Sequence, residues 1–137
     1  MPQPLIRVGT ETAPFLLRGV MEGNVDEMRR AAERGMYWSV QDAIQTGRLR
    51  YSADDPEEEW QFYSQIGAKI ARQGVAFADC EDLAALVAAE LRFCGADPEA
   101  RPVIYKVKPG LVHVIVWSPR FGYLDPSISA GMGGDGQ

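Results

Sequence analysis

The hydrophobic pattern divides the chain into a helix-forming first part and a strand-forming last part. Between residues 60 and 94, apolar residues recur every three or four positions, which is the spacing of one helix face. The clearest stripe runs from Leu83 to Cys94 and, extended backwards, places Cys80 on the buried face. From residue 103 the spacing changes to two, which is typical of strands. The pattern therefore predicts an α+β fold, in which N-terminal helices precede a Cys-bearing helix packed on a small antiparallel sheet.

Residues that favour helix ends stand at the borders of four expected helices. Asparagine, serine and aspartate side chains accept hydrogen bonds from the first turn, and a glycine after the last turn favours termination. The start signals are Asn24 with Glu27, Ser39, Asp55 followed by Pro56 and three glutamates, and Asp79; the stop signals are Gly35, Gly47, Gly74 and Gly95. The predicted helices cover residues 23–35, 39–47, 55–74 and 80–94.

Three short strands are expected in the last third of the chain. Residues 103–108 and 112–117 carry alternating apolar positions and are joined by a Pro-Gly pair, which favours a turn. A third strand is expected over 123–125. Neighbouring antiparallel strands bring the start of one beside the end of the next. We therefore expect His113 to lie beside Asp125.

The length of 137 residues suits one domain. We expect a single domain over residues 1–127, made of a helical part over 1–73 and a core over 74–127. The ending, residues 128–137, is rich in glycine and serine and is expected to form a flexible tail.

Charge and cysteine content narrow the class of protein. The net charge is −5 and no Lys/Arg-rich run is present, which argues against a nucleic-acid partner. No apolar run approaches the roughly 20 residues that span a bilayer, and the first residues do not resemble a signal peptide. Cys80 and Cys94 lie at opposite ends of one predicted helix, too far apart for a disulfide. We therefore expect a cytoplasmic protein.

Cys80, His113 and Asp125 are the candidate catalytic groups. A cysteine in the first turn of a helix has its thiolate stabilised by the helix dipole. His113 is the only histidine in the chain, and Asp125 can orient its ring. Taken singly, these residues also suit a buried thiol, a core histidine and a turn former. The spacing does not match a zinc finger or ribbon, so we expect no metal and no cofactor.

The segments "DCEDLAALVAAELRFCGADPEARPV", "HVIVW" and "GYLDPS" resemble the core of the transglutaminase-like superfamily, relatives of papain-type cysteine proteases. The resemblance covers residues 74–127. It implies that Cys80 is the nucleophile, His113 the base and Asp125 the orienting acid, and that Asp82 is a local structural hydrogen bonder. The chain departs from the family where it lacks a glycine before the cysteine and has isoleucine in place of a tryptophan two positions after the histidine.

Acyl chemistry also needs donors for a tetrahedral oxyanion. The backbone N–H of Cys80 is the first candidate. Gln73 is our candidate side-chain donor, ahead of Gln65 on the preceding predicted helix; the alternative is that Gln73 is merely an exposed residue of the last helical turn.

These features predict thiol-dependent acyl chemistry on peptide or isopeptide amides, of the protease, amidase or transglutaminase type. Hydrolysis and transfer share every step until the thioester is resolved, so the sequence does not choose between them. The alternative is a non-catalytic structural or assembly protein that retains the fold. The glycine-rich ending and overall look are similar to small transglutaminase-like proteins encoded among bacteriophage structural genes, so phage structural proteins are candidate partners and the virion a candidate location. A peptide-binding module with an inert cleft fits less well.

Overall fold

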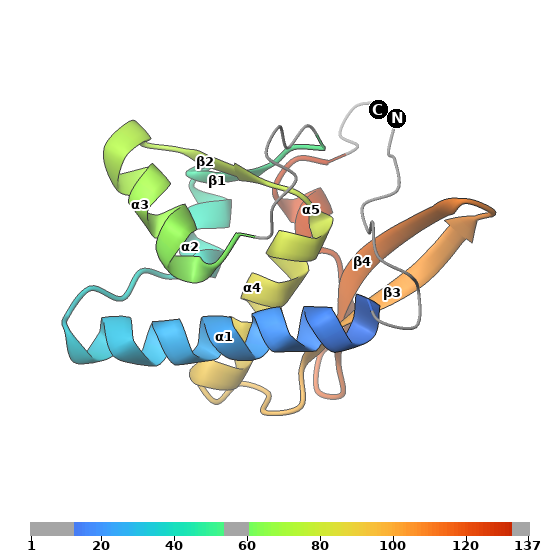
Figure 1. Ribbon diagram of the computed structural model, residues 1–137, viewed down its shortest axis with the longest axis horizontal. Helices are drawn as coiled ribbons and strands as arrows, with labels where there is room; N and C mark the ends of the chain where they lie inside the picture. The colour runs from blue at the N-terminus through green and yellow to red at the C-terminus, as the bar shows by residue number, and fades with distance from the viewer. Residues whose placement is uncertain (1–12, 54–60, 133–137) are drawn as a thin grey trace.

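The central helix, α4 (Cys80–Phe93), is the element on which most of the others pack. The computed structural model describes residues 13–53 and 61–132. In these ranges α4 contacts α1 (Ala13–Glu33) on one side and the strand β4 (Leu111–Ser118) on another (Figure 1). Four alanines of α4 are fully buried, and their small side chains let neighbours approach on several sides. None of the helices in the described ranges is long and apolar enough to cross a lipid bilayer.

The predicted antiparallel sheet is present. It has the order β3-β4-β5, with β3 at Arg101–Lys108 and β5 at Gly122–Leu124. Val114 and Val116 of β4 are fully buried. The helix–sheet arrangement makes this an α+β fold, as the change of hydrophobic period predicted.

The first helix is longer than predicted, and its expected capping residues have another function. Because α1 already begins at Ala13, Asn24 lies in its middle and is fully buried. Asn24 Oδ1 accepts a hydrogen bond from the N–H of Tyr63 at 2.8 Å, and Glu27 Oε1 accepts one from the N–H of Ser64 at 2.8 Å. These are the first N–H groups of α3 (Tyr63–Gln73). The pair predicted to cap its own helix therefore caps a different one.

Asn24→Ala should lower the free energy of unfolding by about 1–3 kcal/mol, because it leaves the buried N–H of Tyr63 without an acceptor. Urea unfolding followed by circular dichroism measures the change. Glu27→Ala is the matched control: its N–H partner on Ser64 is exposed, so water replaces the carboxylate and the loss is smaller. Equal losses in the two variants would contradict this explanation.

The helix predicted from Asp55 begins later. Residues 55–60 lie outside the described ranges, Gln61 and Phe62 are not helical, and α3 starts at Tyr63. The predicted end is confirmed, since Gly74 follows the helix with φ +84°. The cap at Ser39 is also confirmed: its side chain accepts from the N–H of Asp42 at the start of α2 (Val40–Gln45).

Two short strands were not predicted. β1 (Leu49–Tyr51) and β2 (Ala76–Ala78) form a two-stranded parallel pair, in which Tyr51 is the register partner of Ala78. With three residues each, they are too short to show an alternating pattern. β2 leads directly into α4 and so fixes where that helix begins (Figure 1).

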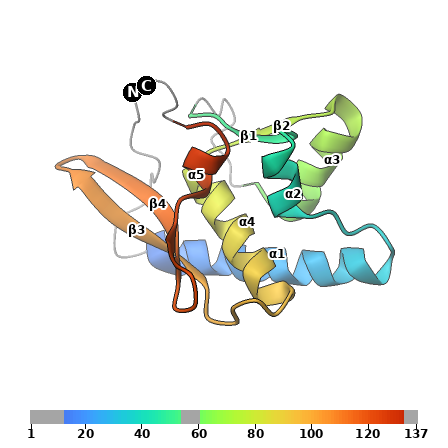
Figure 2. The same ribbon diagram turned by 180° about the vertical axis from the view of Figure 1, so that it is seen from behind.

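The expected flexible tail requires a correction. The helix α5 (Pro126–Ser129) lies beside the N-terminal end of α4 (Figure 2). The carbonyl of Ala130 accepts a hydrogen bond from the N–H of Tyr51 at 3.0 Å, and both Ser127 and Ala130 are buried. Residues 128–132 therefore belong to the folded body, because Asp125 and Pro126 start a helix there. Residues 133–137 lie outside the described ranges.

Candidate active site

Cys80 is the first residue of α4 and is fully buried. The preceding residue, Asp79, is the predicted cap, and its Oδ1 accepts a hydrogen bond from the N–H of Asp82 at 3.1 Å. The thiol receives a hydrogen bond from the backbone N–H of Val114 on β4. That N–H belongs to the peptide group that joins His113 to Val114. Cys80 therefore lies directly beside the backbone of the predicted base.

The structure brings His113 and Asp125 together. His113 Nε2 and Asp125 Oδ2 are 3.0 Å apart, and the imidazole is buried. The other carboxylate oxygen of Asp125 accepts the N–H of Ser127 at 3.1 Å and so caps α5. Tyr105, the register partner of His113 on β3, contacts the ring edge-on at 5.7 Å between centroids. Since Nε2 makes the hydrogen bond seen among the described residues, Nδ1 is the nitrogen left to accept a proton.

The end of β5 explains why Asp125 lies near His113 and Cys80. β5 pairs with β4 only from Val116 to Ser118, and Asp125 follows directly after its last residue. Beyond this point β4 has no β5 neighbour, and the start of α4 lies there, with Cys80 against Val114. Asp125 is close enough to act on the pKa of the Cys80 thiol.

The electrostatic surroundings of Cys80 differ from the prediction. Burial raises the pKa of the Cys80 thiol well above its ordinary value, and the carboxylates of Asp79, Glu81 and Asp125 raise it further. The hydrogen bond from Val114 acts in the opposite direction but is outweighed. The helix N-terminus was expected to favour the thiolate; desolvation and three acids prevail instead. The resting thiol is therefore protonated.

Tyr51 is a site residue that sequence reasoning missed. It is half-buried at the end of β1, opposite Ala78, and its backbone is tied to Ala130 after α5. Burial raises the pKa of the Tyr51 phenol to about 12, and Cys80, Asp79 and Asp125 add to the shift. The phenol therefore lies in the same electrostatic neighbourhood as the thiol and stays protonated. A three-residue strand far from the motif gives no sequence signal for this placement.

Gln73, the candidate oxyanion donor, is not brought to the site. It is an exposed residue of the last turn of α3, separated from Cys80 by Gly74 and all of β2. Gln65 is engaged elsewhere, since its side chain accepts the N–H of Phe62 at 2.8 Å. The geometry therefore does not favour either glutamine for this role.

Asp82 is a structural hydrogen bonder, as the resemblance implied. Its Oδ1 accepts the N–H of Gln61 at 3.0 Å. Burial raises the pKa of the Asp82 carboxyl well above its ordinary value, with a further contribution from Asp79. Cys94, at the other end of α4, is exposed, although the helical stripe had placed it in the core.

We compare the free energy of unfolding of Asp82→Asn with that of the unmodified protein. The difference in favour of the variant should be larger at about pH 8 than at about pH 4. The folded protein holds the Asp82 proton more tightly than the unfolded chain, whose aspartates titrate near about 3.9. Stability is therefore lost as pH rises from that value through the raised folded-state pKa, and asparagine removes this loss. Urea unfolding at both pH values measures the difference, with exposed Asp26→Asn as the control. A difference that does not change with pH would contradict the assignment.

The comparisons with known proteins add no assignment: no family model, curated protein or solved structure matches the chain. In the ranges that the structure describes, no group of three or more His, Cys, Asp or Glu side chains is arranged to hold a metal ion. The candidate site therefore consists of Cys80, His113, Asp125 and Tyr51.

Proposed function

We propose that this protein carries out thiol-dependent acyl chemistry on peptide or isopeptide amides, with a transglutaminase-like fold. The observation that supports this most is the His113–Asp125 hydrogen bond, which leaves Nδ1 of the ring as the acceptor. The backbone N–H of Val114, the next residue of the same strand, acts on the Cys80 thiol. Asp125 holds the imidazole in this tautomer, as the orienting acid of a catalytic triad does. The order of Cys-bearing helix, His-bearing strand and following Asp also supports the proposed fold.

The chemical steps follow from a thiol that is protonated at rest. His113 Nδ1 accepts the thiol proton as the sulfur of Cys80 attacks the carbonyl carbon of the amide. The tetrahedral oxyanion then collapses, the C–N bond breaks, and the imidazolium returns the proton to the leaving amine. A thioester remains on Cys80. Water resolves it to a carboxylic acid, or an amine resolves it to a new amide.

We assign stabilisation of the oxyanion to two groups. The backbone N–H of Cys80 lies in the first turn of α4, where N–H groups have no acceptor four residues earlier. The phenol O–H of Tyr51 replaces Gln73 as the proposed side-chain donor, because Tyr51 pairs with Ala78, two residues before Cys80, and its raised pKa keeps the phenol protonated. The neighbouring carboxylates oppose negative charge here, so these donors are needed for acylation.

Alkylation of the thiol tests the proposal directly. In a Cys94→Ala background, iodoacetamide labelling of folded protein is followed by intact mass. We expect Cys80 to be labelled in the folded state, and His113→Ala to slow this labelling by at least about tenfold, because the base is lost. Labelling that is unaffected by His113→Ala, in a variant with an unchanged circular dichroism spectrum, would refute the proposal.

A second candidate function is a non-catalytic structural or assembly role, such as that of a phage virion component. The complete burial of Cys80 and the three carboxylates that raise its pKa favour this alternative. It predicts that Cys80 is labelled only as fast as the whole protein unfolds. Its partners would be other structural proteins, whereas the enzyme would act on a protein or peptide substrate in the cytoplasm.

A further inference from the structure

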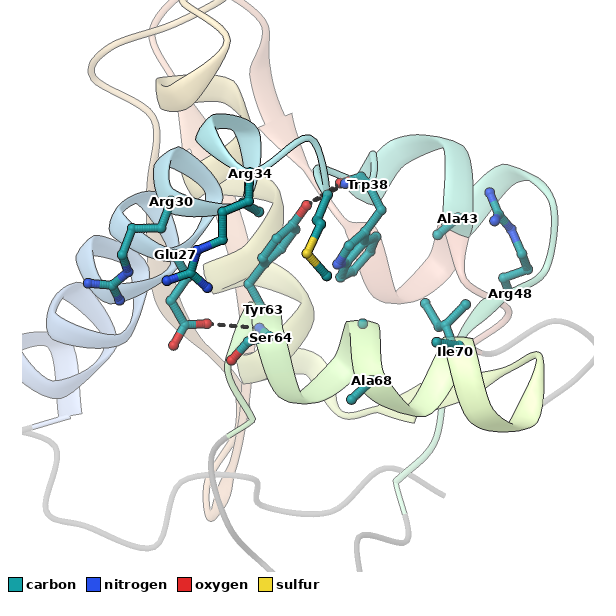
Figure 3. Close-up of a pocket in the computed structure, with 14 residues that line it drawn as sticks. Glu27, Arg30, Arg34, Trp38, Ala43, Arg48, Tyr63, Ser64, Ala68 and Ile70 are labelled. Carbon is teal, nitrogen blue, oxygen red and sulfur yellow. Dashed lines mark hydrogen bonds between the residues drawn. The ribbon is translucent and has the colours of Figure 1, made fainter.

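A cavity lies between α1 and α3, away from Cys80 and His113, neither of which lines it. Its volume is about 570 Å³, and its lining comes from α1, α2, α3 and the segments between them (Figure 3). Glu27 holds the start of α3 against α1, and α3 then runs away from α1 (Figure 1). The cavity fills the angle between the two helices. We call it the α1–α3 pocket.

Trp38 and Tyr63 form an aromatic part of the pocket lining, which we call its floor. The rings of Trp38 and Tyr63 stack with centroids 4.4 Å apart and an interplanar angle of 2°. The Tyr63 hydroxyl accepts the N–H of Trp38 at 2.7 Å and donates to its carbonyl at 2.6 Å, which holds the two residues together. Gly67 makes room for the indole, because a Cβ there would lie 2.4 Å from Trp38 Nε1. The floor is thus formed before any ligand arrives.

The rim of the pocket is positively charged, although the whole chain has a net charge of −5. Arg30 of α1 and Arg34, just after the end of α1, stand at one side and Arg48 at the other (Figure 3). Arg30 pairs with Asp26 at 3.0 Å, and Arg48 with Asp42 at 3.1 Å. Arg34 has no carboxylate partner among the described residues.

Glu27 is the one acidic residue of the lining, and it is committed to the N–H of Ser64. The rim therefore carries three guanidinium groups against one carboxylate, and no ion pair holds the guanidinium of Arg34 within the described residues. The remaining walls are small or apolar, with Ala68, Ile70 and Ala71 on α3.

We propose that the α1–α3 pocket binds a small organic anion with a flat apolar body. The volume lies within the range of about 300–1,000 Å³ that is typical of small-molecule sites. The stacked floor fits an aromatic or other planar group, and Arg34 fits a carboxylate, with which a guanidinium forms two parallel hydrogen bonds. This site does not depend on Cys80 or on the proposed acyl chemistry.

Three probes of equal shape and different charge test the proposal: 2-naphthoate, 2-naphthalenemethanol and 2-naphthylmethylammonium. Titration calorimetry at low salt gives their dissociation constants. We expect naphthoate to bind about tenfold more tightly than the alcohol, since one charge-assisted pair supplies about that factor, and the ammonium to bind most weakly. Arg34→Gln should reduce naphthoate binding to the level of the alcohol.

Arg29→Gln is the matched control, because Arg29 is an exposed arginine of α1, five positions before Arg34, that does not line the pocket. It should leave all three affinities unchanged. Gly67→Ala should weaken the binding of all three probes by displacing the indole of Trp38. If Gly67→Ala does not fold, Ala71→Leu tests the same point, because the larger side chain fills part of the pocket. Equal affinities for the three probes, no binding at millimolar concentration, or equal effects of Arg34→Gln and Arg29→Gln would overturn the proposal.

Discussion

His113→Gln is expected to slow acylation of Cys80 by p-nitrophenyl acetate by roughly 10²–10⁴-fold, the usual contribution of a positioned general base. The effect should be large because the thiol is protonated at rest: burial and three carboxylates raise its pKa, so few thiolates exist without a base. The release of p-nitrophenolate gives the rate, and intact mass confirms acetylation at Cys80 in a Cys94→Ala background.

Asp125→Asn should slow acylation less than His113→Gln does. Asp125 uses one oxygen to accept from Ser127 and the other to hold His113 Nε2, whereas asparagine has a single oxygen and cannot do both. We expect a rate between those of the unmodified protein and His113→Gln. Acylation at the unmodified rate in His113→Gln, with the fold intact by circular dichroism, would remove the imidazole from the mechanism.

Tyr51→Phe is expected to slow acylation by roughly 10²–10³-fold, the loss seen when one oxyanion donor is removed. Alkylation by iodoacetamide should change little. Acylation passes through a tetrahedral oxyanion, which the phenol would stabilise, whereas displacement of iodide at a saturated carbon forms none. The ratio of the two rates on Cys80 therefore reports on the oxyanion rather than on access to the thiol.

Tyr123→Phe serves as the control, since Tyr123 is a strand tyrosine that is 70% exposed. It should leave both rates unchanged. If Tyr51→Phe slows both reactions equally, Tyr51 affects access or packing and is not the donor. If neither rate changes while His113→Gln still slows acylation, the triad stands and the donor lies elsewhere.

The parts of the fold that could be predicted are those determined by neighbours in sequence. Ser39 and Asp79 cap the helices that directly follow them, and residues 103–125 pair with adjacent strands across short turns. The parts that could not be predicted depend on distant partners. Asn24 has the chemistry of a cap, but the N–H that it accepts belongs to Tyr63, 39 positions away.

The same distinction holds for the site. The neighbourhood of His113 and Asp125 could be predicted because both lie on adjacent antiparallel strands joined by a short turn, and Cys80 could be placed at a helix start because Asp79 is a cap. The raised pKa of the Cys80 thiol could not be predicted, because the burial of the thiol and the approach of Asp125 arise only when α4, β4 and α5 pack together. Tyr51 is positioned by the pairing of β1 with β2, which no local sequence pattern predicts.

The double attachment of Asp125 links the proposed catalytic site to the integrity of a single short helical turn. Unwinding α5 would free the carboxylate to swing, release the imidazole from its tautomer, and loosen the anchor that Ala130 gives to Tyr51. The proposed base and the proposed oxyanion donor would then be lost together. Local fraying of about one turn after β5 would therefore abolish the proposed chemistry while α1, α4 and the three-stranded sheet stay packed.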